Sequence, residues 1–216
     1  MPEIKMKNLM EESLVELALI ERKGSITPLI VNASKTGGLG LCNPSILSTD
    51  KKGNFLVNVR NVGYYLHHCE GDLKYQSPWG PLNYVRPDND PHLRTDNFIC
   101  DFNSTTETLS NPRKVDTSFF PKEPEWDFVG LEDARLVNWN GVYYYTGVRR
   151  YAPDGMGRMI LSELTITPTS VKEAKRYIIE PIDDAFCEKN WMPILHMPFH
   201  YVKWSNPLEI IRADMP

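Results

Sequence analysis

A short sequence theme occurs three times in the chain, and it constrains the fold more than any other feature. Each occurrence starts with a segment rich in Asn, Asp or Glu, reaches a turn, and continues as a strand of aromatic or β-branched residues. The three occurrences cover residues 43–60, 132–149 and 188–204. Their polar residues Asn43, Glu132 and Lys189 lie nine or ten positions before the glycine or proline of the turn. The pattern predicts three versions of one β-hairpin.

Further strand candidates lie between these hairpins, at Asn97–Phe102 and Gly157–Thr165. A polar first strand followed by apolar strands is typical of a β-propeller blade, whose inner strand lines a central channel. The 17 Pro and 13 Gly residues also suit many short strands joined by turns. We therefore expect an all-β fold of the β-propeller type. A β-sandwich is the alternative, because its strands also come as hairpins.

The spacing of the hairpins bears on domain organisation. We expect one propeller-like domain over residues 1–216, with an N-terminal segment at 1–40, helical or hairpin, and blades at 41–216. The blades that can be counted number three to four, and a propeller needs at least about four to close. The expected propeller is therefore incomplete, or it closes with another subunit, which makes a homo-oligomer one option.

Charge and apolar patterning argue against several classes of protein. The formal net charge of −4 and the pI near 5.8 give no basic face for nucleic acid. No apolar run is long enough to span a membrane, and the first eight residues lack the apolar core of a signal peptide, so we expect a cytoplasmic protein. The four cysteines have no metal-ligand spacing and are expected to be reduced, mostly buried thiols, without a metal site.

Polar residues at the start of an inner strand would project into the mouth of the channel. These residues are Asn43, Glu132, Asp133, Glu188, Lys189 and Asn190. Neighbours in a strand point to opposite faces, so only one of Glu132 and Asp133 can be the central group, and we favour Asp133. Arg135 shares the face of Asp133 and can hold the carboxylate or a ligand. The alternative is that these charges form ordinary ion pairs at a channel rim.

Three segments together resemble glycoside hydrolase family 130, the β-mannoside phosphorylases and related mannosidases. They are Asn43-Pro44, Gly130-Leu131-Glu132-Asp133-Ala134-Arg135 and Glu188-Lys189-Asn190-Trp191-Met192-Pro193. The resemblance implies a five-bladed β-propeller and an inverting reaction in which Asp133 donates a proton while phosphate, or water, attacks the anomeric carbon. Ala134 departs from the family, which usually has proline at this position.

Phosphate as the attacking group needs cations around it, and an oligosaccharide partner needs polar and aromatic contacts. We expect phosphate to be bound by four residues, Arg149, Arg150, Lys189 and His200. We expect substrate to be bound by six residues, Asn43, Arg60, Glu132, Arg135, Tyr145 and Asn190. No cofactor is expected besides inorganic phosphate as a co-substrate. The alternatives are a β-mannoside hydrolase, a glycan-binding propeller without activity, and part of a larger glycan-modifying enzyme.

Overall fold

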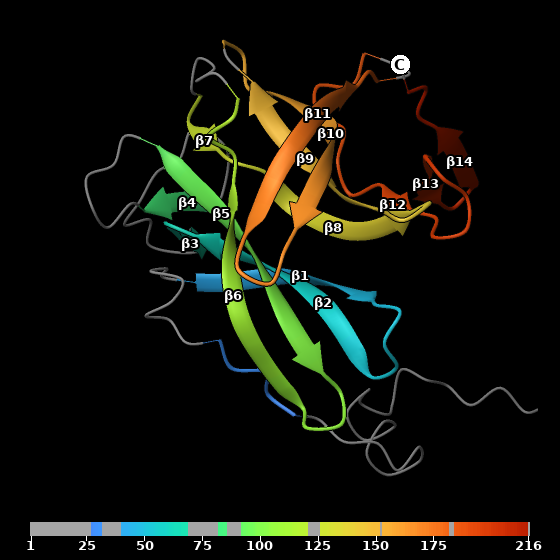
Figure 1. Ribbon diagram of the computed structural model, residues 1–216. Coiled ribbons are helices and arrows are strands. Elements are labelled where there is room, and N and C mark those ends of the chain that lie inside the picture. The colour runs from blue at the N-terminus through green and yellow to red at the C-terminus, as the bar shows by residue number, and fades with distance from the viewer. Residues whose placement is uncertain are drawn as a thin grey trace, which may run out of the picture. The chain divides into compact units, whose positions relative to one another are not determined.

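The protein is all-β, as expected. The computed structural model describes residues 27–31, 40–68, 82–85, 92–120, 126–151, 153–181 and 184–215, which contain fourteen strands and no helix (Figure 1). The chain divides into two compact units, Met1–Ile30 and Val31–Pro216, and all the described strands belong to the second. The N-terminal helix or hairpin considered from the sequence lies mostly outside the described residues. Within the described part of the chain, no helix is long and apolar enough to cross a bilayer.

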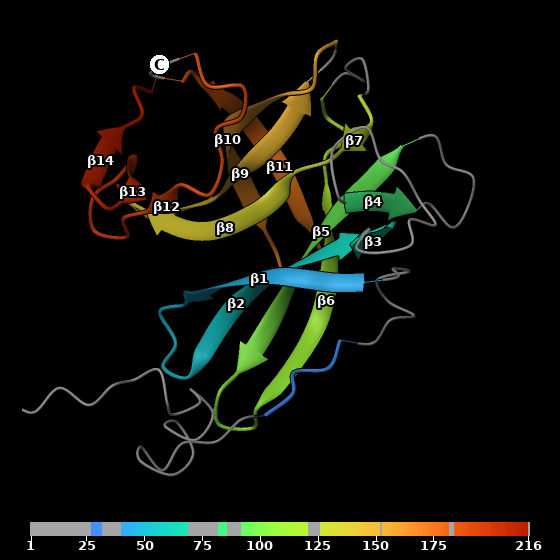
Figure 2. The same cartoon turned by 180° about the vertical axis from the view of Figure 1, so that it is seen from behind.

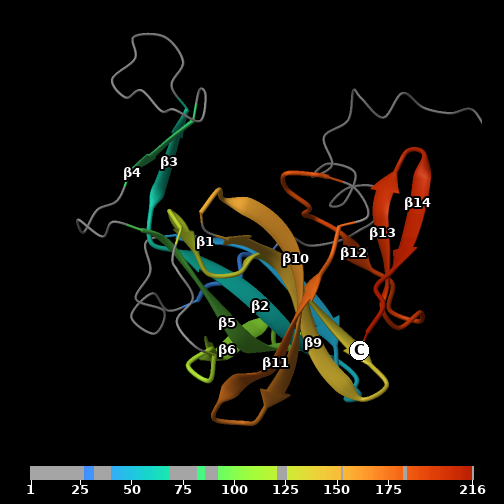
Figure 3. The same cartoon turned by 90° about the horizontal axis from the view of Figure 1, so that it is seen from above.

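The first module is formed by four antiparallel strands in the spatial order β1–β2–β5–β6. The strands are β1 (Gly40–Ser48), β2 (Asn54–Val62), β5 (Leu93–Asn103) and β6 (Thr108–Asp116). Between β2 and β5 the chain forms a separate hairpin, β3 (Tyr65–His68) with β4 (Leu82–Val85), which extends away from the module in Figure 3.

The second module has the same plan, with four antiparallel strands in the order β8–β9–β10–β11. They are β8 (Glu132–Trp139), β9 (Val142–Tyr151), β10 (Met156–Ile166) and β11 (Val171–Ile179). A two-residue parallel ladder between β6 and β11 joins the modules, and β7 (Phe128–Val129) pairs with β5. β1 and β8 contact each other side by side without a ladder (Figure 2). The eight-strand path is therefore nearly closed and barrel-like.

A third module of three antiparallel strands follows. It consists of β12 (Met192–Pro193), β13 (His200–Ser205) and β14 (Leu208–Arg212), in that spatial order. The hairpins β1–β2, β8–β9 and β12–β13 are the three hairpins predicted from the repeated theme. The strands predicted at Asn97–Phe102 and Gly157–Thr165 are also present, as parts of β5 and β10.

The modules are held together by apolar cores between their faces. One core joins the first and second modules and includes Leu47, Ile99, Leu136, Tyr145 and Ile160. A second core joins the second and third modules and includes Val137, Trp139, Leu161, Trp191 and Tyr201.

Strand β10 shows why the second module needs a neighbour on both of its faces. Its residues Met159 and Leu161 belong to one core and Ile160 to the other, and all three are at most 1% exposed. A continuous apolar run is what a strand needs when both of its faces are covered, because alternate side chains point to opposite sides.

Candidate functional site

The first strands of the first two modules, β1 and β8, are both interrupted by a bulge in which the backbone turns left-handed. The ladder of β1 shifts register between Cys42 and Ser45, and that of β8 shifts between Glu132 and Arg135. Asn43 lies in the first bulge with φ 45° and Asp133 lies in the second with φ 53°. Asn and Asp adopt this conformation more readily than other residues with a Cβ atom, so the backbone itself favours these residue types here.

The third module repeats the left-handed backbone at Asn190, whose φ is 64°, just before β12 begins. Asn43, Asp133 and Asn190 therefore hold equivalent places, each two residues before a residue that pairs with the neighbouring strand: Ser45, Arg135 and Met192. The sequence comparison had aligned Asn43 with Glu132 and Lys189, which is wrong by one residue. The inserted bulge residue could not be recognised from hydrophobic periodicity.

These three residues meet at one cavity of about 570 Å³. Its lining consists of Asn43, Pro44, Ser45, Asp133, Ala134, Arg135 and Asn190. Asp133 is the only carboxylate among these lining residues, so the cavity combines one acid with amides, a hydroxyl and a guanidinium.

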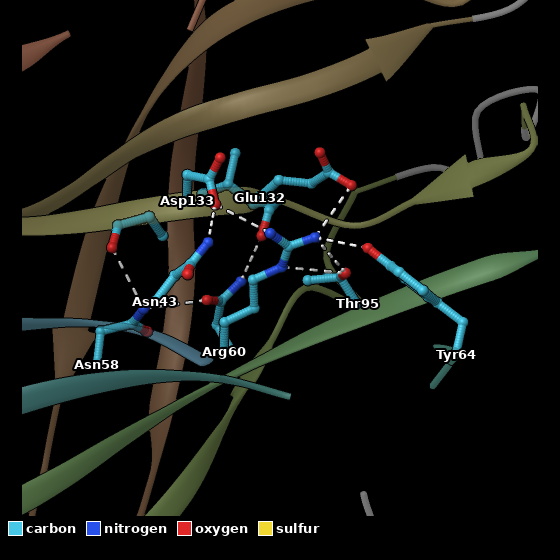
Figure 4. A network of polar contacts seen from close by, with 10 residues as sticks. Asn43, Asn58, Arg60, Tyr64, Thr95, Glu132 and Asp133 are labelled. Carbon is cyan, nitrogen blue, oxygen red and sulfur yellow. Dashed lines mark hydrogen bonds and ion pairs between the residues drawn. The ribbon is translucent and has the colours of Figure 1, made fainter. Parts of the chain in front are cut away.

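Arg60, near the end of β2, holds the carboxylates of the second module (Figure 4). Its Nη1 donates to Asp133 Oδ1 at 2.9 Å. Its Nη2 lies 3.1 Å from Glu132 Oε1, in an ion pair without hydrogen-bond geometry. Asn43 Nδ2 also donates to Asp133 Oδ1. One buried guanidinium thus faces two neighbouring carboxylates, and an amide of the first module fixes one of them.

A further pair of residues orients Arg60. Its Nη2 donates to the Tyr64 hydroxyl at 2.8 Å, and both Nε and Nη2 reach Thr95 Oγ1 at 3.4 Å. Burial raises the pKa of Tyr64 to about 12, so this hydroxyl stays protonated near neutral pH. The guanidinium is therefore held by neutral groups on one side and faces carboxylates on the other.

Two buried amides connect the modules beneath this cluster. Asn58 Nδ2 donates to Asn97 Oδ1 at 3.1 Å and to the Ala134 carbonyl at 3.3 Å. Asn97 Nδ2 donates in turn to the Leu131 carbonyl at 2.8 Å. Both asparagines are at most 7% exposed. These bonds satisfy the backbone carbonyls around the β8 bulge, which would otherwise be buried without partners.

Glu132 and Asp133 share one cation. Burial is the largest influence on the pKa of Glu132 and raises it, while the Arg60 charge opposes this and the Asp133 charge adds to it. Arg150 and Lys189 also act on Glu132, and their positive charges lower its pKa. Burial outweighs these cations, so the Glu132 carboxyl holds its proton to a higher pH than an exposed glutamate does.

Gly147 gives the bulge room to form. A Cβ atom at this position would lie 2.5 Å from the Glu132 carbonyl oxygen and 3.2 Å from Ala134 Cα. The backbone of β8 can therefore approach β9 at the bulge only because position 147 has no side chain.

The structure brings six of the expected residues together and separates others from them. Asn43, Arg60, Glu132, Asp133, Arg135 and Asn190 contribute to the cavity or to the cluster that supports it. Tyr145 and Arg149 instead line another cavity, of about 590 Å³, between the first and second modules. Burial raises the pKa of Tyr145, whose hydroxyl lies by Glu173 and Ser162.

The other expected phosphate ligands are spread around the cluster. Arg150 Nη1 donates to the Gly155 carbonyl at 3.1 Å, and its guanidinium lies over the Phe186 ring. Lys189 is exposed. His200 Nδ1 lies 2.9 Å from the Pro198 carbonyl oxygen. No common anion position is evident for these three among the described residues.

Two expectations about side-chain direction were wrong. Glu132 and Asp133 do not point to opposite faces, because the bulge cancels the alternation and both carboxylates reach Arg60. Of the two roles expected for Arg135, holding the carboxylate falls to Arg60, and Arg135 lines the cavity where a ligand would lie.

Glu188 does not join the channel-facing group either. It is buried, pairs with Lys203 Nζ at 2.9 Å and accepts a hydrogen bond from Trp191 Nε1.

Sequence reasoning missed three supporting residues, Asn58, Thr95 and Asn97. A signal existed for Asn58, because an amide in the apolar run Phe55-Leu56-Val57-Asn58-Val59 is unusual in a buried strand. Free thiols were predicted, and Cys42, Cys100 and Cys187 are free, but only Cys100 of these is fully buried. Cys69 lies outside the described residues.

Nothing in the described part of the chain assembles three or more His, Cys, Asp or Glu side chains into a metal site. No protein-family model, curated protein or solved structure matches this chain.

Proposed function

We propose that the cavity at Asp133 cleaves β-mannosides with phosphate, by an inverting reaction of the kind that the sequence resemblance implies. The observation that supports this most is the convergence of three modules on one carboxylate, through Asn43, Asp133 and Asn190. Amides and hydroxyls from separate strands suit a ligand rich in hydroxyl groups, since each can donate and accept hydrogen bonds.

In the proposed reaction Asp133 is the proton donor. One phosphate oxygen forms a bond to the anomeric carbon while the bond from that carbon to the glycosidic oxygen breaks. The leaving oxygen takes the proton, which yields mannose 1-phosphate and the shortened sugar. Arg60 and Asn43 hold the Asp133 carboxyl at the cavity, where a proton donor is needed because a glycosidic oxygen leaves readily only when it is protonated.

We further propose that the three modules are blades of a β-propeller. The support is the shared antiparallel plan, the left-handed residue at the same place in each module, and the cores that lie between successive modules. In a propeller the inner strands line a central channel, and the cavity residues come from β1, from β8 and, with Asn190, from the segment before β12.

The test is to incubate the purified protein with mannobiose and with mannosyl-glucose, with and without phosphate. Mannose 1-phosphate that forms only with phosphate supports phosphorolysis, and free mannose without phosphate supports the hydrolase instead. Asp133→Asn should reduce turnover by roughly 10²–10⁴-fold. Asp96→Asn, at an exposed ion pair with Lys114, is the matched control. Binding of these sugars without any product would leave a glycan-binding protein and overturn the proposed reaction.

A further inference from the structure

Arg135 is the cation of the cavity that has no protein partner. It follows the β8 bulge, lines the cavity beside Asp133, and makes no hydrogen bond or ion pair with any residue that the structure describes. Its Nε is buried and unsatisfied. A buried guanidinium N–H without an acceptor is unfavourable, so an acceptor that arrived from outside would be bound favourably.

The same position in the other modules shows that the backbone does not require a cation here. Ser45 holds this position in β1 and Met192 holds it in β12. Ser45 Oγ accepts a hydrogen bond from the Leu136 backbone N–H at 3.1 Å, which leaves the hydroxyl proton of Ser45 available to a ligand. Only the second module, which also carries Asp133, places a guanidinium at the cavity.

Neighbouring groups add donors for an anion. Asn190 lines the same cavity from the third module, and its amide makes no hydrogen bond with the described residues. Arg150 and Lys189 lie close enough to lower the pKa of Glu132 by their positive charge. The four cations Arg60, Arg135, Arg150 and Lys189 outnumber the two carboxylates Glu132 and Asp133 beside the cavity. An anion that entered the cavity would be attracted by these positive charges.

We propose that Arg135 and the Asn190 amide form an oxyanion site, and that its ligand is inorganic phosphate. A planar guanidinium can give two parallel hydrogen bonds to a phosphate, and the amide N–H₂ gives a further donor. The site changes the expected phosphate ligands, because it replaces Arg149 and His200 with Arg135 and Asn190. The role of this phosphate as the attacking group rests on the proposed function, whereas its binding does not.

Direct binding tests the site without turnover. Inorganic phosphate is titrated into the wild-type protein and into Arg135→Gln, Arg135→Lys and Arg149→Gln, and heat is measured by calorimetry. We expect Arg135→Gln to weaken binding by about 10–100-fold, because a charge-assisted pair of hydrogen bonds is lost. Arg135→Lys should lie in between, since it keeps the charge but loses the fork. Unfolding midpoints in urea show whether each variant is folded.

Two results would overturn the site: phosphate binding that is unchanged in Arg135→Gln, or binding that Arg149→Gln weakens as much. A parallel titration with mannose 1-phosphate shows whether the oxyanion that binds is free phosphate or a sugar phosphate. If that ester binds through Arg135 and inorganic phosphate does not bind, the assignment to inorganic phosphate is wrong. Phosphate binding that depends on Arg135 without cleavage of any mannoside would keep the site and reject the proposed function. Phosphate-dependent cleavage that is unaffected by Arg135→Gln would keep the proposed function and reject the site.

Discussion

The interface between the first and second modules is polar at its inner end, whereas the interface between the second and third modules is aromatic. Three polar residues of the first module face the second, and less polar residues hold the equivalent places in the second module. The equivalent pairs are Asn58 and Thr146, Arg60 and Val148, and Asn97 and Met159. The same backbone plan therefore carries a polar network at one interface and apolar packing at the other.

The aromatic interface has tight ring contacts. The centroid of Trp139 lies 5.2 Å from that of Phe199 and 5.7 Å from that of Tyr201, and Tyr201 contacts Trp191 at 5.8 Å. Such packing buries large areas and contributes strongly to stability. The polar interface buries charges and amides, which stabilise little when complete but fix side-chain positions well. Both interfaces have an apolar core, but the second adds clustered aromatic rings and the first adds the polar network beside the cavity.

Removing an aromatic ring should have the largest effect on stability. Trp139→Ala is expected to lower the free energy of unfolding by about 4 kcal/mol, because Trp139 is 1% exposed and the cavity left behind is lined by other rings. Urea unfolding measures this. Trp204→Ala is the control, since Trp204 is 61% exposed and should change stability by only about 0.5 kcal/mol. If both variants lose a similar free energy of unfolding, the aromatic interface does not stabilise the fold more than an exposed ring does.

Breaking the polar interface should come next. Arg60→Met leaves Glu132 and Asp133 without their shared cation, and we expect a loss of about 3 kcal/mol in urea unfolding. Lys114→Met, which removes an exposed ion pair with Asp96, should cost about 1 kcal/mol or less. If the two variants lose equal stability, the Arg60 cluster is not a buried network in solution.

The sequence was informative about this comparison only where the signal was local. The hairpin β8–β9 could be predicted because Val142-Tyr143-Tyr144-Tyr145 follows a turn at Asn140-Gly141, and this run suits a strand that is covered on both faces. Asp133 could be singled out as a carboxylate at the start of an inner strand. These predictions depend on neighbours in the chain.

The partners of Asp133 could not be predicted in the same way. Arg60 and Asn43 lie 73 and 90 residues before it, and no periodicity connects them. The bulge at Asp133 adds one residue to the strand, so the two-residue alternation placed Glu132 on the wrong face. Register errors of one residue reverse every expected side-chain direction, which explains why the site residues were found more reliably than their contacts.

Adding a methyl group beside the bulge should have a smaller effect on stability, and it tests how closely β8 approaches β9. Gly147→Ala places a Cβ atom 2.5 Å from the Glu132 carbonyl oxygen, so β8 must shift and the free energy of unfolding should fall by about 2 kcal/mol. Gly63→Ala is the control, because the nearest atom there is 3.5 Å away. Equal stability of the two variants in urea would mean that β8 does not approach β9 as closely as described.

The pH dependence of Glu132 should give the smallest effect. Burial raises its pKa, so between its ordinary value of about 4.3 and the raised value the folded chain holds more protons than the unfolded chain. Its contribution to stability is therefore present at low pH and is lost as pH rises through the raised pKa.

Glu132→Gln removes this titration, so the stability of the variant relative to wild type should increase with pH over that window. Urea unfolding from about pH 4 to 8 measures it. Glu163→Gln, at a partly exposed pair with Lys175, is the control. Parallel pH profiles for wild type and Glu132→Gln would show that the polar interface does not hold this carboxyl in a buried environment.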